Sequence, residues 1–446
     1  MSSIDMPLTA NLTAPYVAYA YSYPHKSSYG ELTPAVSLDE LWQQENRRNL
    51  FLYVHLPFCE MRCGFCNLFA RAGGDDATYD LYLDSVERQA RRMSAATVGD
   101  RSVARLALGG GTPTVLSAAQ LDRLFQMLVR YFDADPRQIP MSVESSPKTA
   151  SQEKLDLLRQ WGVERVSIGV QSFVESEVHS IGRPQQSAEV HGALSRIKQA
   201  GFPVLNIDLI YGQPQQTLAS WNESLDAALR YKPEEIFLYP LYVRPQTGLG
   251  RRDIPLESDP PQTIELYRAG RDRLLAAGYR QLSMRSFTLK SETDDEGPEY
   301  CCQSDGMLGL GAGARSYATR LHYSSRFAVQ AAGVKTILDQ WVTRTEEDFG
   351  KADWGIWLTE EERQRRFIIQ SLLHYKGLQR QRFIEAFGLT PETRIPELRE
   401  LIDADWIEQD DDVLRLTSEG MAMSDAIGPA LYSASCREAL EAFAAK

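Results

Sequence analysis

The sequence predicts an α/β protein whose largely parallel sheet curves into a barrel or partial barrel, followed by a small winged-helix-like domain. Short β-rich runs recur through the first two thirds of the 446 residues, amphipathic helical patterns separate them, and polar or glycine residues gather where the runs end. Strands that alternate with helices pair in parallel through helical crossovers. Polar residues at the carboxyl ends of strands are typical of a barrel's active-site loops, although a doubly wound open sheet places ligands there too.

The predicted strands are nearly continuous apolar runs, as expected when both faces of a sheet are covered. In chain order they are "FLYVHL", "RLALGG", "PMSVES", "RVSIGVQS", "VLNIDLIYG", "EIFLYPLYV" and "YRQLSM". Residues 78–93 and 118–132, which lie between strands, have helical patterns. One apolar face of the second helix is formed by Leu121, Leu124, Phe125 and Leu128.

The chain changes character after about residue 325, so we divide it into an amino-terminal segment (1–45), a barrel (46–325) and a C-terminal cover domain (326–446). In "WLTEEERQRRFIIQSLL", Thr359 and Glu362 have the spacing of a capping box at the start of a helix. Short helical segments and the hairpin-like "WIEQDDDVLRLTSEG" follow. The acidic stretch "DADWIEQDDD" at the presumed wing would repel phosphate, so we interpret this domain as a structural cover and not as a DNA-binding module.

Charge and hydropathy exclude several functional classes. The formal net charge is −12 without basic clusters, which argues against nucleic-acid and anionic-membrane partners. No stretch approaches ~18 consecutive apolar residues, so no membrane span is expected. The start, "MSSIDMPLTANLTAPYV", lacks the basic and apolar regions of a signal peptide. We therefore expect a cytoplasmic protein with reduced thiols.

Three cysteines stand close together in "YVHLPFCEMRCGFCNLF" (residues 53–69), directly after a predicted buried strand. In a reducing compartment such a cluster indicates metal binding or catalysis more than a disulfide. Structural zinc takes four ligands, and no further Cys or His follows nearby; His55, on the strand before, is expected to be a packed histidine. A four-iron cluster takes one thiolate per iron, so three cysteines leave one iron open for an exchangeable ligand. The remaining cysteines, which we expect to fill the core, are Cys301, Cys302 and Cys436.

The CxxxCxxC motif with Phe65 before its last cysteine resembles the radical S-adenosylmethionine (SAM) superfamily. The segments "YVHLPFC", "GGGTPT", "SVESSP", "SIGVQSF", "NIDLIYGQP" and "GLGAGARSY" stand in the order found in oxygen-independent coproporphyrinogen III oxidases. The resemblance implies a partial (β/α)6 TIM-like barrel and a [4Fe-4S] cluster on Cys59, Cys63 and Cys66, with SAM on the open iron. An electron from the reduced cluster then cleaves SAM to a 5′-deoxyadenosyl radical that abstracts hydrogen. It also implies an electron donor such as flavodoxin or ferredoxin, and a small-molecule substrate such as a porphyrinogen.

The same resemblance assigns two SAM sites. The residues implied for the first SAM, the one on the cluster, are Tyr53, Gly110, Glu144 and, through its backbone, Arg315, where the family residue is apolar. The residues implied for a second SAM are Phe65, Gly111, Thr112, Gln171, Arg183 and Asp208. An acid inside an apolar strand is costly unless it has a partner, so a buried ion pair between Asp208 and Arg183 is the alternative.

The chain departs from the oxidases at two places. Leu68 stands where they have a fourth cysteine, and Arg285 with Ser286 replaces an Asp-His pair. The stretch "PEYCCQSDGMLGLG" also lacks the HNxxYW segment of the related haem chaperones. We therefore carry three hypotheses: a radical SAM oxidoreductase acting on a tetrapyrrole-like or other bulky substrate, a methylase or cyclopropane-forming enzyme that uses a second SAM, and a haem chaperone. No catalytic residue for the substrate step is predicted.

Overall fold

The computed structural model of the chain describes residues 15–252, 260–289 and 301–444. Residues 1–14 of the predicted amino-terminal segment lie outside these ranges, as do residues 298–300 of the stretch that we compared with the haem chaperones. No helix within the described ranges is both long and apolar enough to cross a membrane.

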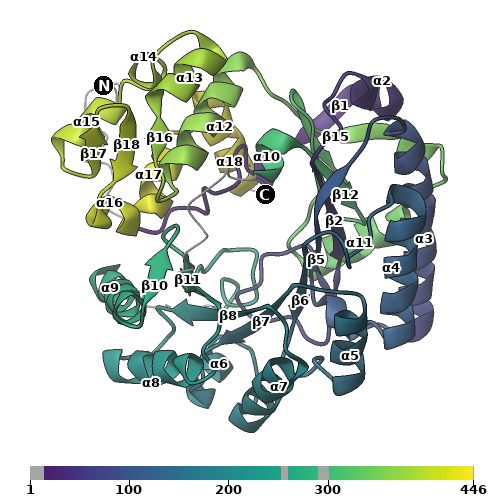
Figure 1. Ribbon diagram of the computed structural model, residues 1–446, viewed down its shortest axis with the longest axis horizontal. Helices are drawn as coiled ribbons and strands as arrows, with labels where there is room; N and C mark the ends of the chain where they lie inside the picture. Colours follow the sequence, from purple (N-terminus) through teal and green to yellow (C-terminus); the bar gives the residue numbers. More distant parts are fainter. Residues whose placement is uncertain (1–14, 253–259, 290–300, 445–446) are drawn as a thin grey trace.

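One strongly curved sheet organises the barrel part of the chain (Figure 1). Its parallel strands are β2 (Leu50–Leu56), β5 (Val103–Gly110), β6 (Met141–Ser145), β7 (Arg165–Gln171), β8 (Val204–Tyr211), β9 (Glu235–Pro240) and β12 (Met307–Leu310). Its antiparallel strands are β1 (Gly30–Ser37), β10 (Tyr279–Gln281), β11 (Ser286–Leu289), β13 (Arg315–Tyr317), β14 (Leu321–Ser324) and β15 (Lys351–Trp357). The order across the sheet is β1-β15-β14-β13-β12-β2-β5-β6-β7-β8-β9-β11-β10.

The sheet is a partial barrel, as predicted, and not a closed one. Its edge strands β1 and β10 do not pair with each other in the described chain. In Figure 1 the C-terminal elements lie across the opening between these two edges. Strand pairing runs past both predicted boundaries of the barrel, because β1 and β15 belong to the same sheet. The division of the chain at residues 45 and 325 therefore stays a prediction.

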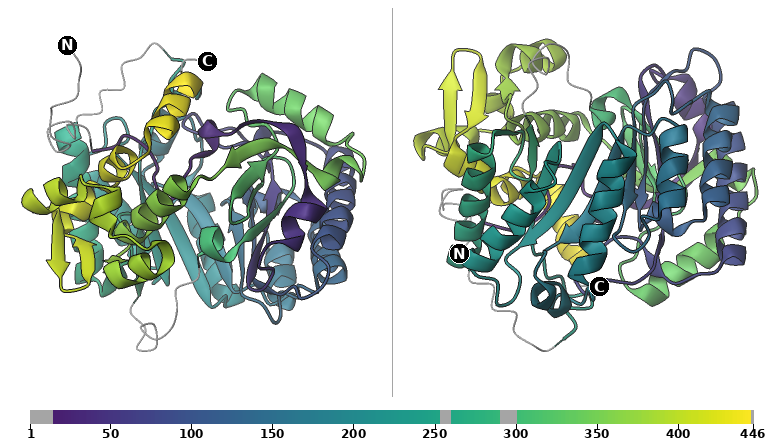
Figure 2. Two further views of the ribbon diagram at one scale, coloured as in Figure 1. Left: turned by 90° about the horizontal axis from the view of Figure 1, so that it is seen from above. Right: turned by 60° about the horizontal axis from the view of Figure 1, so that its bottom comes forward.

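Helices cover the outer side of the sheet (Figures 1 and 2). They include α3 (Asp76–Ala96), α4 (Ala118–Phe132), α5 (Gln152–Gln160), α7 (Ser187–Ala200), α8 (Leu218–Leu229) and α9 (Pro260–Ala276). The other helices of this part are α2 (Leu38–Gln43), α6 (Glu175–Ser180), α10 (Cys302–Asp305) and α11 (Ala331–Trp341), with 3₁₀ turns η1 (Lys26–Ser28), η2 (Pro113–Val115) and η3 (Asp348–Gly350). The predicted apolar face of α4 is buried, and Ser117 with Gln120 forms its capping box.

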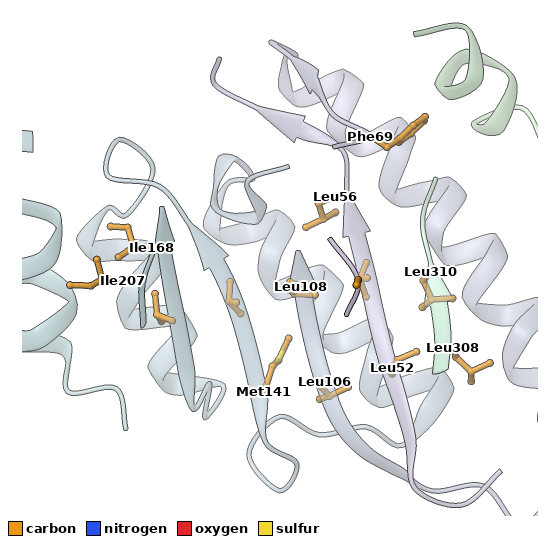
Figure 3. Packing of buried hydrophobic residues seen from close by; sticks show 14 of the residues in the cluster. Leu52, Leu56, Phe69, Leu106, Leu108, Met141, Ile168, Ile207, Leu308 and Leu310 are labelled. Atoms are coloured by element: carbon orange, nitrogen blue, oxygen red, sulfur yellow. The ribbon is translucent and has the colours of Figure 1, made fainter. Parts of the chain in front are cut away.

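The strand register separates a core face from a site face. In one row across four strands, Leu308, Leu52, Leu106 and Met141 are neighbours, and all are at most 2% exposed (Figure 3). Side chains alternate along a strand, so the residues between these positions point to the opposite, inner face. Burying each of these apolar side chains contributes about 1.5–3 kcal/mol, which fixes the register and with it the residues that face inward.

The C-terminal domain has the predicted winged-helix-like composition. It contains α12 (Glu360–Leu372), α13 (Arg380–Phe387), α14 (Pro391–Arg394), α15 (Leu398–Asp403), α16 (Ser418–Ala422), α17 (Ser424–Ala430) and α18 (Ala434–Ala444). Its small sheet has the order β16 (Leu378–Gln379), β18 (Val413–Leu416), β17 (Ile407–Asp410). The Thr359 hydroxyl caps α12 by accepting from Glu362 N at 3.2 Å, which is half of the predicted capping box.

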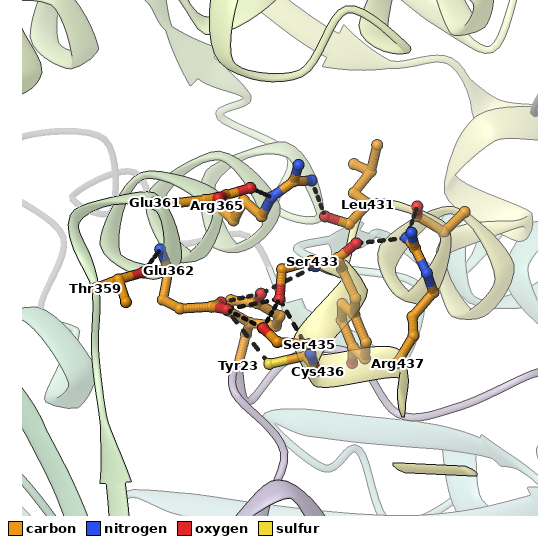
Figure 4. Close-up of polar contacts among 12 residues, drawn as sticks. Tyr23, Thr359, Glu361, Glu362, Arg365, Leu431, Ser433, Ser435, Cys436 and Arg437 are labelled. Carbon is orange, nitrogen blue, oxygen red and sulfur yellow. Dashed lines mark hydrogen bonds and ion pairs between the residues drawn. The ribbon is translucent and has the colours of Figure 1, made fainter. Parts of the chain in front are cut away.

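The other half of the box does not form, because the Glu362 carboxylate turns toward the amino-terminal segment. It accepts hydrogen bonds from Tyr23 and from Ser433, both buried (Figure 4). Nearby, the backbone N–H groups of Val17 and Ala18 donate to the carbonyl of Asp425 at 3.2 and 3.1 Å. The amino-terminal segment is thus held by the C-terminal domain, and it passes through the middle of the molecule (purple in Figure 1).

Candidate functional site

Cys59 ends the short strand β3 (Phe58–Cys59), and Cys63 and Cys66 lie in the loop that leads from it to β4 (Arg71–Ala72). The loop is held by backbone contacts: Gly64 N donates to Ile181 O at 3.1 Å, and Leu249 N donates to Gly64 O at 2.7 Å. A side chain at Gly64 would come 2.7 Å from the Ile181 carbonyl oxygen, so only glycine allows this close approach. The three thiols are free and half-buried.

The donor set fits an iron–sulfur cluster better than a single metal ion. In the described chain, no three His, Cys, Asp or Glu side chains converge as ligands of one ion. A [4Fe-4S] cluster instead takes each thiolate on a different iron, so its ligands surround it and do not meet at one point. Burial raises the pKa of Cys59 to about 12, so this thiol is neutral until a metal binds. Three thiols without a fourth cysteine in the loop suit a cluster with one open iron.

Two side chains that we assigned to a second SAM contact the triad itself. Arg183 Nη1 lies 3.1 Å from Cys63 Sγ, and Thr112 Oγ1 lies 3.6 Å from Cys59 Sγ. Arg183 is buried and also donates to Gly169 O at 2.8 Å. Hydrogen bonds to cluster sulfurs are among the factors that set reduction potential, so these contacts are relevant to a bound cluster.

Tyr53, Gly110 and Glu144 come together from the neighbouring strands β2, β5 and β6. Gly110 N donates to Glu144 Oε2 at 3.0 Å. A side chain at Gly109 would come 2.9 Å from Glu144 Oε1 and 3.1 Å from the Tyr53 hydroxyl, which shows that these two polar atoms face the same spot. Gly110 has φ of +112°, and a Cβ there would meet the His55 ring at 2.5 Å, so glycine is required. Three predicted SAM residues thus form one surface.

Glu144 lies on the inner face of the sheet. Its side chain is exposed to water, yet burial by surrounding protein raises its pKa to about 7, and the charge of Asp208 adds to the rise. Exposure and desolvation are compatible when a carboxylate borders a water-accessible space that protein encloses. Tyr19 shows the same combination, because its side chain is 43% exposed and yet burial by surrounding protein raises its pKa. We use the name central hollow for the region of the inner face of the sheet that Tyr53, Glu144, Asp208 and Arg315 share, where the last two are half-buried.

Asp208 and Arg183 do not form the buried ion pair that we considered as an alternative. Asp208 accepts from Asn206 Nδ2 at 2.8 Å and from Ser167 Oγ at 3.3 Å. Burial raises the pKa of Asp208 to about 6, and the hydrogen bond from Asn206 opposes this rise. Asp208 is therefore a carboxylate without a cationic contact in the described chain, on the same inner face as Glu144.

The other residues predicted to bind a second SAM are Phe65, Gly111 and Gln171, and each of them has different neighbours. Phe65 packs against an apolar cluster that contains Ile181 and Leu249. Gly111 is closed in by the Phe58 carbonyl, so a side chain there would clash. Gln171, at the end of β7, has a left-handed backbone with φ of 70° beside an irregularity in the strand register. Their roles toward SAM stay predictions.

His55 is a packed histidine, as expected. Its Nε2 lies 2.8 Å from Phe69 O and its Nδ1 3.1 Å from the Tyr53 hydroxyl, and burial lowers its pKa to about 4. Of the remaining cysteines, Cys436 is buried beside Glu362, and Cys301 lies 3.7 Å from Gln370 Oε1. Neither approaches the triad.

Sequence reasoning overlooked two cationic side chains, one in the amino-terminal segment and one packed against it. Arg285, noted only as a departure from the oxidases, forms an ion pair with Asp425 of α17, and both side chains are fully buried. Lys26 of η1 lies over the Phe327 ring, with Nζ 3.9 Å from the ring centroid. The segment "YAYSYPHK" with its clustered aromatic and basic residues was the available signal, but nothing in the sequence places it beside the strands.

Arg183, which contacts Cys63, also lines a pocket of about 330 Å³ together with Glu60, Lys148 and Glu189. Glu60 Oε1 accepts from Ser146 Oγ at 2.8 Å, and Glu60 Oε2 has no hydrogen-bond partner among the described residues. The pocket does not include Tyr53, Glu144 or Asp208. We therefore locate the candidate site in the central hollow, where the predicted polar residues meet.

Comparisons with known proteins identify related families and a related fold. Residues 53–228 match the Radical SAM superfamily model, and residues 358–423 match the HemN C-terminal domain model. The chain is 30% identical over 380 residues to oxygen-independent coproporphyrinogen III oxidase of Escherichia coli, covering 80% of this chain and 79% of that protein. It is 29% identical over 384 residues to the heme chaperone HemW of Bacillus subtilis, covering 84% and 97%. The solved structure of the Escherichia coli oxidase HemN matches with a TM-score of 0.80 and 25% identity, covering 96% of this chain and 99% of that one.

Proposed function

Because the chain belongs to the family of radical SAM proteins that contains oxygen-independent coproporphyrinogen III oxidase and HemW, we propose that it is an enzyme that binds a [4Fe-4S] cluster on Cys59, Cys63 and Cys66. The observation that carries the proposal is the convergence of Tyr53, Gly110 and Glu144 on one inner surface of the sheet. When bound, the reduced cluster supplies an electron for the cleavage of SAM, which starts hydrogen-atom abstraction.

The chain's own residues would bind and orient the cofactor. The thiolates hold three irons, while Arg183 and Thr112 donate toward two of the sulfurs. The Glu144 carboxylate is fixed by Gly110 N–H on one oxygen, which leaves the other free to accept from an ammonium or ribose hydroxyl group. A cation next to Glu144 would favour its ionised form and so oppose the effect of burial on its pKa.

The amino-terminal segment and the C-terminal domain would exclude water from the reacting atoms. Tyr23 is bonded to Glu362 and Ser433, and Tyr21 accepts from Met284 N at 3.1 Å, so the segment is tied to both halves of the molecule. An enclosed site strengthens electrostatic interactions and protects reactive species from side reactions. A bulky substrate would therefore bind next to the amino-terminal segment.

For the finer activity, we propose an oxidoreductase that acts on a tetrapyrrole-like or other bulky substrate, with flavodoxin or ferredoxin as electron donor. The similarity to the Escherichia coli oxidase over most of both chains supports the proposed oxidoreductase activity. A methylase or cyclopropane-forming enzyme is the alternative that would use a second SAM, and Asp208, which lacks a cationic contact, is the feature that favours it. A haem chaperone is favoured by the similarity to HemW, which extends over 97% of that protein.

The test is anaerobic incubation of the iron-reconstituted protein with SAM and dithionite, with 5′-deoxyadenosine measured by mass spectrometry. An enzyme should release it, and Cys63→Ala should not. Cys301→Ala is the matched control because its thiol lies outside the triad, and it should behave like the wild type. A protein that binds haem stoichiometrically without producing 5′-deoxyadenosine would instead be a chaperone.

A further inference from the structure

The Arg183 guanidinium is fixed by hydrogen bonds from each of its three nitrogens. Nη1 donates to Cys63 Sγ at 3.1 Å, Nη2 donates to Gly169 O at 2.8 Å, and Nε donates to Gln185 Oε1 at 3.0 Å. A guanidinium is a planar, rigid fork, so two fixed acceptors determine where its remaining nitrogen points. The fold therefore directs one nitrogen of this cation at the Cys63 sulfur.

Gln185 determines the orientation of Arg183. Its Nε2 donates to Val170 O at 2.6 Å and to Ser172 O at 3.3 Å, so the two carbonyls hold the amide nitrogen on their side. The amide oxygen must then face Arg183 Nε, which it accepts. Gln185 is 7% exposed, so water does not readily replace it as the partner of the arginine. Gln185 thus acts on the triad through Arg183 and touches no cysteine itself.

Arg183 has no carboxylate partner. Among the residues that the structure describes, no acid forms an ion pair with it, although Glu60 and Glu189 line the same pocket. Arg183 is 9% exposed, and a buried cation is costly unless an anion compensates it. The sulfur of Cys63 becomes a thiolate when iron binds, and of the described contacts of Arg183 it is the one that then carries negative charge.

The second contact to a triad sulfur is neutral and longer. Thr112 Oγ1 lies 3.6 Å from Cys59 Sγ, and its hydroxyl brings no charge. Hydrogen bonds between charged groups are roughly twice as strong as neutral ones. Reduction adds one negative charge to an iron–sulfur cluster, and net charge and hydrogen bonds to the sulfurs set its reduction potential. A cation fixed on a ligating sulfur therefore stabilises the reduced cluster more than the oxidised one.

We propose that Arg183 raises the reduction potential of the cluster bound by the triad, and that Gln185 is the positioning residue that keeps Arg183 on Cys63. This inference rests on the proposed radical SAM function and adds a determinant of electron entry to it. Arg183 receives a role that does not depend on a second SAM, to which the family resemblance assigned it. A higher potential lets a donor such as flavodoxin or ferredoxin reduce a larger fraction of the cluster at a given donor potential.

The experiment measures the midpoint potential of the reconstituted cluster by an anaerobic redox titration monitored by EPR. SAM is left out, so the measurement reports the effect of the side chains on the cluster alone. The variants Arg183→Met, Arg183→Lys and Gln185→Leu are compared with Lys148→Met. Lys148 is exposed, lines the same pocket and, in the described part of the chain, makes no hydrogen bond to a cysteine sulfur, so this control removes an equal charge without the contact. Circular dichroism and iron content show that each variant is folded and carries a cluster.

Hydrogen bonds to charged groups change equilibria by about tenfold or more. Arg183→Met should therefore lower the ratio of reduced to oxidised cluster about tenfold at a fixed potential, which is a shift of about 59 mV to more negative values for one electron. Arg183→Lys keeps the charge without the fork, so its potential should lie between those of Arg183→Met and the wild type. Gln185→Leu should shift the potential in the same direction by less. Lys148→Met should change the ratio less than twofold, because salt and water screen an exposed charge.

A ratio in Arg183→Met within twofold of the wild type would overturn the proposal. Equal shifts in Arg183→Met and Lys148→Met would overturn it as well, because the charge of the pocket and not the Cys63 contact would then set the potential. If Arg183→Met does not retain the cluster, Gln185→Leu decides, and a wild-type potential in that variant is the contrary result. Failure of the proposed enzymatic function gives a different outcome, namely no 5′-deoxyadenosine from the wild type while its potential still differs from that of Arg183→Met.

Discussion

Replacing Asp425 with Ala should destabilise the protein by about 3–5 kcal/mol, because it leaves the Arg285 guanidinium buried without its carboxylate. Arg285 is 2% exposed and Asp425 0%. Tyr242 also donates to the Asp425 carboxylate, so the substitution removes the acceptor of two donors. The rings of Tyr19 and Tyr21, with centroids 4.6 and 5.1 Å from Arg285 Cζ, keep water away from the cation that remains.

The pair itself should contribute little net stability. Nε and Nη1 of Arg285 and Oδ1 of Asp425 have no hydrogen-bond partner among the described residues, so the geometry does not compensate fully for desolvation. Replacing a buried pair with apolar side chains of similar size is often neutral or stabilising by about 1–4 kcal/mol. The double variant Arg285→Met/Asp425→Leu should therefore recover most of the stability lost in Asp425→Ala.

The assay is equilibrium unfolding in guanidinium chloride, followed by tryptophan fluorescence. Asp425→Ala should lower the transition midpoint without changing the slope, and the double variant should return it toward the wild-type value. A loss below about 1 kcal/mol in Asp425→Ala would refute the reasoning, because an uncompensated buried charge costs more than that. So would a double variant as unstable as the single one.

Three further predictions concern the site. Cys63→Ala should abolish the visible absorption of the reconstituted cluster and Cys301→Ala should retain it, since only the triad thiols are proposed to bind iron; retention of full iron content in Cys63→Ala would contradict the assignment. Glu144→Gln should remove the pH dependence that the raised pKa of Glu144, about 7, gives to apoprotein stability. Ionisation of a desolvated acid disfavours the folded state, so the wild type should lose stability relative to Glu144→Gln as the pH rises from about 4.5 through 7, and parallel curves would contradict this. Asp208→Asn should leave basal SAM cleavage intact but abolish substrate turnover and remove one of two SAM sites measured by equilibrium dialysis, whereas a single site in the wild type would refute a second SAM bound at Asp208 and Arg183.

Local patterns in the sequence predicted the partial barrel and its helices well, because apolar periodicity decides which face each element buries. The apolar stripe of α4 follows from spacing alone. The capping box at Thr359 was only half right, since Glu362 is drawn away by Tyr23 and Ser433. A distant polar partner in the fold outweighed a local capping preference.

Spacing in the sequence did not reveal which residues, far apart along the chain, lie together in the fold. Tyr23 and Glu362 are 339 positions apart, and no periodicity relates them. For the same reason the sequence did not bring Lys26 to Phe327 or pair Arg285 with Asp425. Family motifs reach only residues that the motifs contain, and the six segments quoted for the resemblance contain none of these residues.

The most direct test of the central claim is electron–nuclear double resonance of the reduced, reconstituted protein with SAM labelled with ¹⁵N at its amino group and ¹⁷O at its carboxylate. If Cys59, Cys63 and Cys66 leave one iron open for SAM, both labels should show hyperfine coupling to the cluster, and adding SAM should change its EPR spectrum. Absence of coupling from both labels, with an EPR spectrum that SAM does not alter, would contradict the account.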